Sequence, residues 1–121
     1  MADARGVAAA LLAKIVAMFS TGDLRDAETV FAADYVDHQG LRGESISGVD
    51  GFRRVVTAAR APYARLVVTV VDRTVEGDRI SARLHWRGVQ TTDARTVERE
   101  TVEILRIADG RVVEHWGTRV S

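Results

Sequence analysis

The chain of 121 residues contains no cysteine, one proline (Pro62) and one lysine (Lys14). Without cysteine it has no disulfide, no thiolate nucleophile and no cysteine-ligated metal. Its 17 basic and 17 acidic residues balance to a formal net charge of zero. The chain therefore lacks the positive excess that nucleic-acid-binding and membrane-surface proteins carry, and we expect neither partner.

A long hydrophobic run is also missing. The apolar start at residues 6–19 is preceded by Asp3, interrupted by Lys14 and followed by an amphipathic pattern, which disfavours a signal peptide. No run approaches the roughly 20 apolar residues that span a bilayer. The sequence predicts a single soluble, cytoplasmic domain over residues 1–121, a length typical of one domain.

Helical spacing marks the first half of the chain. Apolar side chains recur at this spacing from Ala8 to Phe19, and Gly22 predicts the end of that helix. Asp23 is the predicted N-cap of a second helix at residues 24 to about 33. Residues 35–48 combine polar side chains with three glycines, which predicts short extended pieces and turns. A third helix is expected from about residue 50 to residue 60, because Pro62 disfavours its continuation.

The second half of the chain reads as strands. Residues 66–75, 79–89, about 96–107 and 111–120 predict a four-stranded antiparallel meander with turns at residues 76–78 and 109–110. Residues 79–89 alternate strictly, with Ile80, Leu84 and Trp86 on one apolar face. Three N-terminal helices packed on this curved antiparallel sheet make an α+β fold. A sheet that curls around helices leaves a cone whose wide end is a ligand site.

Three segments resemble a known family. Residues 31–38 (FAADYVDH), 48–52 (GVDGF) and 104–116 (ILRIADGRVVEHW) resemble segments of the SnoaL-like polyketide cyclases. That family belongs to the nuclear-transport-factor-2-like superfamily, with ketosteroid isomerases and limonene-epoxide hydrolases. The resemblance implies a cone-shaped α+β barrel with cofactor-free acid/base chemistry in the cone. It also implies a small apolar ligand and a homodimer packed through the outer sheet face.

His38 and Glu103 are the predicted catalytic residues. An imidazole exchanges protons near neutral pH, and by resemblance His38 falls about where ketosteroid isomerases carry their general base. The alternative is a histidine that only ties a loop to the sheet. Asp37 would point to the opposite face of a strand and is expected to be exposed or capping. By resemblance, Glu103 lies where the isomerases hold a protonated carboxylic acid that stabilises an oxyanion.

Five residues are predicted to bind substrate. Trp86 lies on the apolar side of its strand, where its ring is either core or a surface for a planar ligand. Trp116 is expected in the same cavity wall. Gln90 occupies the end of a strand motif in which the family tends to carry histidine, and its amide can bond a carbonyl. Tyr35 and Tyr63 either donate phenolic hydrogen bonds or pack.

One departure from the family pattern leaves the function open. The principal acid/base aspartate of the cyclases corresponds to Val120, and the carboxylate of the epoxide hydrolases to Thr118. The first hypothesis is a cofactor-independent cyclase or isomerase for an apolar, carbonyl-bearing, polyketide-like intermediate. The alternatives are a non-catalytic small-molecule-binding or dimerisation module, or an epoxide-hydrolase-like enzyme. The three histidines lack the spacing of metal ligands, so no metal is expected.

Overall fold

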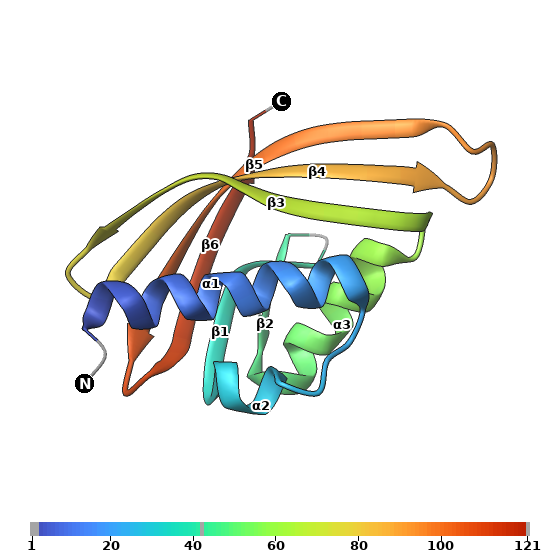
Figure 1. Cartoon of the computed structure of the whole chain (residues 1–121). Coiled ribbons are helices and arrows are strands. Elements are labelled where there is room, and N and C mark those ends of the chain that lie inside the picture. Colours follow the sequence, from blue (N-terminus) through green and yellow to red (C-terminus); the bar gives the residue numbers. More distant parts are fainter. Residues whose placement is uncertain (1–2, 42, 121) are drawn as a thin grey trace.

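Helices and one large sheet make up the computed structural model, which describes residues 3–41 and 43–120. The elements in chain order are α1 (Ala4–Thr21), α2 (Ala27–Val30), β1 (Phe31–Leu41), β2 (Glu44–Ser47), α3 (Gly48–Arg60), β3 (Tyr63–Glu76), β4 (Arg79–Gln90), β5 (Thr96–Ala108) and β6 (Arg111–Arg119). The strands lie in the order β2-β1-β6-β5-β4-β3. Figure 1 shows α1 running beneath the bent strands, with α2 and α3 beside β1 and β2.

The sheet is mixed, because β1 pairs parallel to β6 while the other neighbours are antiparallel. The predicted α+β class is confirmed, but the purely antiparallel four-stranded sheet is wrong. Residues 35–48, predicted as short extended pieces and turns, form most of β1 and the short strand β2, and β1 also includes residues 31–33, which were predicted as helix. A register shift between Asp37 and Leu41 breaks the alternation of β1, so the sequence shows no clean two-residue period there.

The helices depart from the predicted ranges in one place. α1 ends as predicted at Gly22, which adopts a left-handed φ of 76°. The second helix is much shorter than expected and begins after Asp26, so Asp23 is not its N-cap. Asp23 instead accepts hydrogen bonds from Arg25. The helix stops early because Phe31 already pairs with β6.

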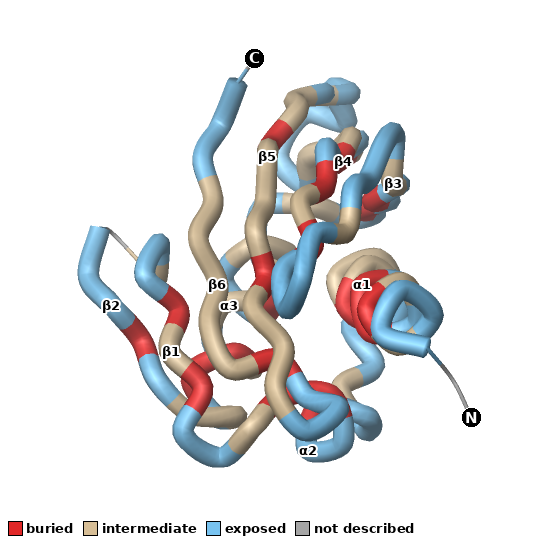
Figure 2. Tube along the Cα trace, turned by 90° about the vertical axis from the view of Figure 1, so that its left-hand side faces the viewer, coloured by how far each residue is buried: buried red, intermediate tan, exposed pale blue. Residues whose placement is uncertain are grey.

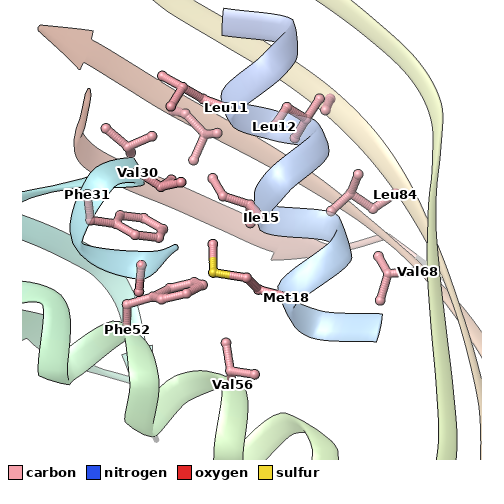
Figure 3. Packing of buried hydrophobic residues seen from close by; sticks show 14 of the residues in the cluster. Leu11, Leu12, Ile15, Met18, Val30, Phe31, Phe52, Val56, Val68 and Leu84 are labelled. Carbon is pink, nitrogen blue, oxygen red and sulfur yellow. The ribbon is translucent and has the colours of Figure 1, made fainter. Parts of the chain in front are cut away.

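The core lies between α1, α3 and the inner sheet face. Figure 3 shows Ile15 and Met18 of α1 directed toward Phe31 and Phe52, and Figure 2 shows buried positions along the side of α1 nearest the sheet. The predicted alternation of β4 is confirmed, since Ile80, Ala82, Leu84 and Trp86 are all buried. Among the described residues, α1 is the one helix that is long and apolar enough to cross a membrane, but the core helix of a soluble protein passes the same test. Its apolar stripe packs in this core.

Breaks in strand register accompany the curvature of the sheet. Register shifts lie in β3 between Val70 and Asp72 and in the β5–β6 pair between Arg106 and Ile107. Such irregularities bend strands and increase their twist. Figure 1 shows β3, β4 and β5 bending above α1. The curved sheet and the helices beneath it enclose a cavity, which is described below.

Truncating the core side of α1 tests this packing. Met18 is buried and Lys14 is exposed on the same helix. We expect Met18→Ala to lower the free energy of unfolding by about 2–5 kcal/mol, because it removes buried apolar volume and leaves a void. The control Lys14→Ala should change it by no more than about 0.5 kcal/mol. Urea unfolding followed by circular dichroism measures both; equal losses in the two variants would contradict the packing of α1.

Candidate functional site

A cavity of about 330 Å³ lies between the inner sheet face and helices α1 and α3. Most of its lining is apolar: Leu12, Ile15, Phe19, Phe31, Leu41, Phe52, Val55, Ala58, Ala59, Leu84, Trp86 and Leu105. The polar lining residues are Tyr35, Asp37, Gln39, Arg99, Thr101, Glu103, His115 and Arg119. A mostly apolar cavity with a few convergent polar groups is the usual form of a small-molecule site.

His115 is the centre of the polar cluster in this cavity. Its Nδ1 lies 2.9 Å from Asp37 Oδ1, and its Nε2 lies 2.5 Å from Glu103 Oε1. The side chains of His115, Asp37 and Glu103 are only 13%, 3% and 12% exposed. They come from β6, β1 and β5, which are neighbours in the sheet. The parallel pairing of β1 with β6 sets Asp37 directly beside His115.

Asp37 anchors this cluster. Besides His115, its Oδ1 accepts hydrogen bonds from the backbone N–H groups of Gln39 and Gly40, at 3.0 and 2.9 Å. Burial favours the neutral acid, but the His115 contact and the two N–H donors outweigh it and lower the pKa of Asp37. Asp37 therefore stays ionised. The turn that supplies the two N–H groups requires glycine at position 40, where φ is +56° and a Cβ would fall 1.6 Å from the Glu44 carbonyl oxygen.

The expectation that Asp37 is exposed or capping was half right. It caps the turn at residues 39–40, but its side chain is buried and faces the cavity rather than solvent. A carboxylate that is buried and fully engaged in this way orients an imidazole, as the aspartate of a catalytic triad does. In this protein that imidazole belongs to His115 and not to the adjacent His38.

His115 carries a positive charge at neutral pH. Burial alone would lower its pKa, but hydrogen bonds from its ring to Asp37 and Glu103, together with their charges, raise the pKa to about 9. Burial, followed by the charge of Asp37, raises the pKa of Tyr35, so this phenol stays neutral. The cluster thus presents an imidazolium between two carboxylates, with a neutral hydroxyl beside them.

Three of the predicted site residues line the cavity: Tyr35, Trp86 and Glu103. The Trp86 indole N–H donates to Thr101 Oγ1 over 2.8 Å, which holds the ring in the wall. The Arg99 guanidinium lies over the Trp86 ring, 4.9 Å from its centroid. Phe19 meets the same ring edge-on at a centroid distance of 5.1 Å. Trp86 therefore belongs to the wall, with a cation above it.

The structure places His38 outside the cavity, which corrects the expectation that it faces inward. Its Nε2 lies 2.7 Å from Glu114 Oε2, its ring stacks on Trp116 at 5.0 Å, and its side chain is 38% exposed. Neighbouring side chains point to opposite faces of a strand. Because Asp37 points inward, His38 has to point outward.

The other predicted binding residues also lie away from the cavity lining. Trp116 is on the outer side, where Arg79 lies over its ring at 4.9 Å. Tyr63 and Gln90 face each other at the end of the β3–β4 pair. The Tyr63 ring covers Gly88, where a Cβ would come within 2.4 Å of it. Val120, at the position that the resemblance assigns to the family aspartate, is exposed and is not among the residues that line the cavity.

Sequence reasoning missed His115 and Arg99 as cavity residues. The strand alternation contained the signal, since His115 and Trp116 are adjacent and only one of them can face inward. Because Trp116 was predicted to lie in the cavity wall, the adjacent His115 would have been assigned to the outer face. Arg99 shares its strand face with Thr101, Glu103 and Leu105, all of which line the cavity. Among the described residues, no group of three His, Asp or Glu side chains has the arrangement of metal ligands.

A curved mixed sheet over helices, with a polar cluster in an apolar cavity, is consistent with the nuclear-transport-factor-2-like fold. The chain belongs to the SnoaL-like domain family, whose sequence profile matches residues 12–115. The comparison with curated protein sequences finds no significant match.

Solved structures show the same fold. TsrD from Streptomyces laurentii is 24% identical over 98% of this chain and 91% of its own, with a TM-score of 0.84. IdmH from Streptomyces antibioticus, described as a candidate polyketide cyclase, is 25% identical over 92% and 90%, with a TM-score of 0.80. A ketosteroid-isomerase-like protein from Catenulispora acidiphila, solved with trimethylamine, is 16% identical over 89% and 83%, with a TM-score of 0.77.

The raised pKa of His115 makes the stability of the fold depend on pH. A group whose pKa rises on folding contributes stability below its unfolded value, and that contribution is lost as pH rises through the folded value. For His115 these values are 6.5 and about 9. We expect the free energy of unfolding to fall by about 3 kcal/mol across this interval. Urea unfolding at a series of pH values measures the fall.

The matched variants are His115→Gln, which should flatten this dependence, and His85→Gln on the outer face, which should preserve it. His85 contacts Glu98 at 3.2 Å and does not line the cavity. A slope that survives in His115→Gln contradicts the assignment of the charge to His115.

Proposed function

We propose that this protein is a cofactor-independent cyclase or isomerase that acts on an apolar, carbonyl-bearing, polyketide-like molecule by acid/base catalysis in the cavity. The observation that carries the proposal is the Asp37–His115–Glu103 cluster, buried in an otherwise apolar cavity. Buried ionised groups are costly, and clusters of them with shifted pKa values gather at catalytic sites. A module that only binds a ligand has no need of this cost, so the cluster favours the enzyme over the non-catalytic alternative.

Glu103 is the proposed base in place of His38. His115 occupies one oxygen of Glu103, and a carboxylate has a second oxygen that can accept a proton. Glu103 removes a hydrogen from the carbon next to a carbonyl, and the electron pair of the broken C–H bond delocalises onto the carbonyl oxygen. The positive charge of His115, whose two N–H groups stay on Asp37 and Glu103, stabilises that oxyanion electrostatically. Asp37 keeps His115 charged and oriented.

The enolate then has two outcomes. In a cyclisation its carbon attacks a second carbonyl of the same molecule, a C–C bond forms, and the new alkoxide takes the proton from Glu103. In an isomerisation Glu103 returns the proton to a different carbon. Both outcomes leave the carboxylate and the imidazolium as they began, so no cofactor is consumed. The wall of Phe19, Leu84 and Trp86 holds the substrate folded, and such positioning lowers the barrier further.

Enolisation of an apolar ketone tests the proposed base directly. The probe is 2-tetralone in D₂O, whose α-hydrogens exchange for deuterium when an enolate forms; ¹H NMR measures the rate. We expect Glu103→Gln to slow the enzyme-dependent exchange by about 10²–10⁴-fold, because the amide cannot accept the proton. His38→Gln, outside the cavity, should exchange at the wild-type rate. Equal rates for Glu103→Gln and wild type would remove Glu103 from the mechanism.

We also propose that the protein acts in the cytoplasm as a homodimer joined through the outer face of the sheet. β3 at the edge of the sheet exposes Val67 (43%) and Val71 (51%), and apolar side chains in water favour burial against a partner. Sedimentation equilibrium should give twice the chain mass for the wild type. The double variant Val67→Glu and Val71→Glu should give the single-chain mass, whereas Lys14→Ala should remain dimeric. A monomeric wild type would contradict the dimer.

A further inference from the structure

Arg99 is a cation in the cavity wall that the proposed reaction does not use. It lies on β5, directly opposite Trp86 of β4. Its Nε is buried and has no hydrogen-bond partner among the described residues. A buried donor left without a partner costs free energy, and native structures rarely keep one without a reason. The Trp86 ring makes a cation–π contact with the Arg99 guanidinium but accepts no conventional hydrogen bond from it.

The two polar parts of the cavity are well separated. Arg99, Thr101 and Glu103 alternate along one face of β5, and Thr101 pairs with Arg119 of β6. The step of four residues along the strand from Arg99 to Glu103 corresponds to about 13 Å between their Cα atoms. Thr101 lies between them on the same strand, opposite the apolar Leu84 of β4. A molecule that reaches from Arg99 to Glu103 is elongated.

We propose that the substrate carries a carboxylate that Arg99 binds, at the far end of an apolar body from the carbon that Glu103 deprotonates. The planar guanidinium, with its Nε edge unoccupied by described residues, matches the two oxygens of a carboxylate. Thr101 fixes Trp86 by a hydrogen bond, and Trp86 fixes the plane of Arg99. The inference rests on the proposed function for the role of Glu103, but the carboxylate site is testable by binding alone.

The test compares two aryl methyl ketones that differ in the carboxylate. 6-Acetyl-2-naphthoate carries the ketone and the carboxylate at opposite ends of a planar apolar body, and 2-acetylnaphthalene lacks the carboxylate. Isothermal titration calorimetry should show wild type binding the carboxylate at least about tenfold more tightly than the neutral ketone, as expected for a charge-assisted hydrogen bond. Equal affinities for the two ketones would overturn the proposal.

Arg99→Met keeps the length of the stem and removes the charge, so it should abolish the preference and leave the affinity for 2-acetylnaphthalene within about twofold. The matched control is Arg87→Met, an exposed arginine on β4 outside the lining, which should keep the preference. A preference that survives in Arg99→Met would overturn the proposal. If circular dichroism shows that Arg99→Met does not fold, Arg99→Lys replaces it. Arg99→Lys should lower the preference for the carboxylate, because an ammonium lacks the two parallel N–H donors of a guanidinium. An unchanged preference in Arg99→Lys would count equally against the proposal.

One variant separates this inference from the proposed function. Glu103→Gln should lose the exchange of the α-hydrogens of 2-tetralone but still prefer 6-acetyl-2-naphthoate over 2-acetylnaphthalene. A wild type that shows the carboxylate preference without any exchange would sink the proposed function and support the carboxylate site. A wild type that exchanges the α-hydrogens of 2-tetralone but binds the two naphthyl ketones equally would support the proposed function and overturn the carboxylate site.

Discussion

The contact of His115 with Asp37 on one side and Glu103 on the other is the interaction on which the site depends. Both carboxylates raise the pKa of the buried imidazole, because their hydrogen bonds and charges oppose the lowering that burial alone would cause. Removing either carboxylate leaves buried charge without its full compensation. The three residues therefore act as one unit whose charge state holds across the neutral pH range.

The sheet supplies that contact from three separate parts of the chain. β6 lies between β1 and β5, so its inward side chain has a neighbour on each side. The parallel pairing aligns Asp37 with His115, and the antiparallel pairing brings β5 against the other edge. Gly117 leaves the space that the side chains of Glu103 and Gln39 occupy, because a Cβ there would come within 2.5 Å of Glu103 Oε1 and of Gln39 Oε1. A side chain at this position would push both polar groups out of place.

Several features were readable from the residues. The strict alternation of residues 79–89 predicted the buried face of β4, and Glu103, which was selected from the family resemblance, lines the cavity. The resemblance to SnoaL-like cyclases is confirmed by the family match. The selection of His38 failed because the sequence shows two adjacent titratable residues without saying which one faces inward. Imidazole chemistry favoured His38, whereas the strand phase selected Asp37.

By itself the sequence determined the α+β class, the apolar inner face and the presence of ionisable residues on strands, because these depend on composition and on periods of two and about 3.6 residues. Only the tertiary structure decided that β1 lies parallel to β6, since no local pattern encodes which strands become neighbours across some 80 residues of chain. That pairing turned Asp37 and His115 into partners and sent His38 and Trp116 to the outer surface. The charge of the site follows from the same fact, because a pKa is set by the groups that folding brings into contact.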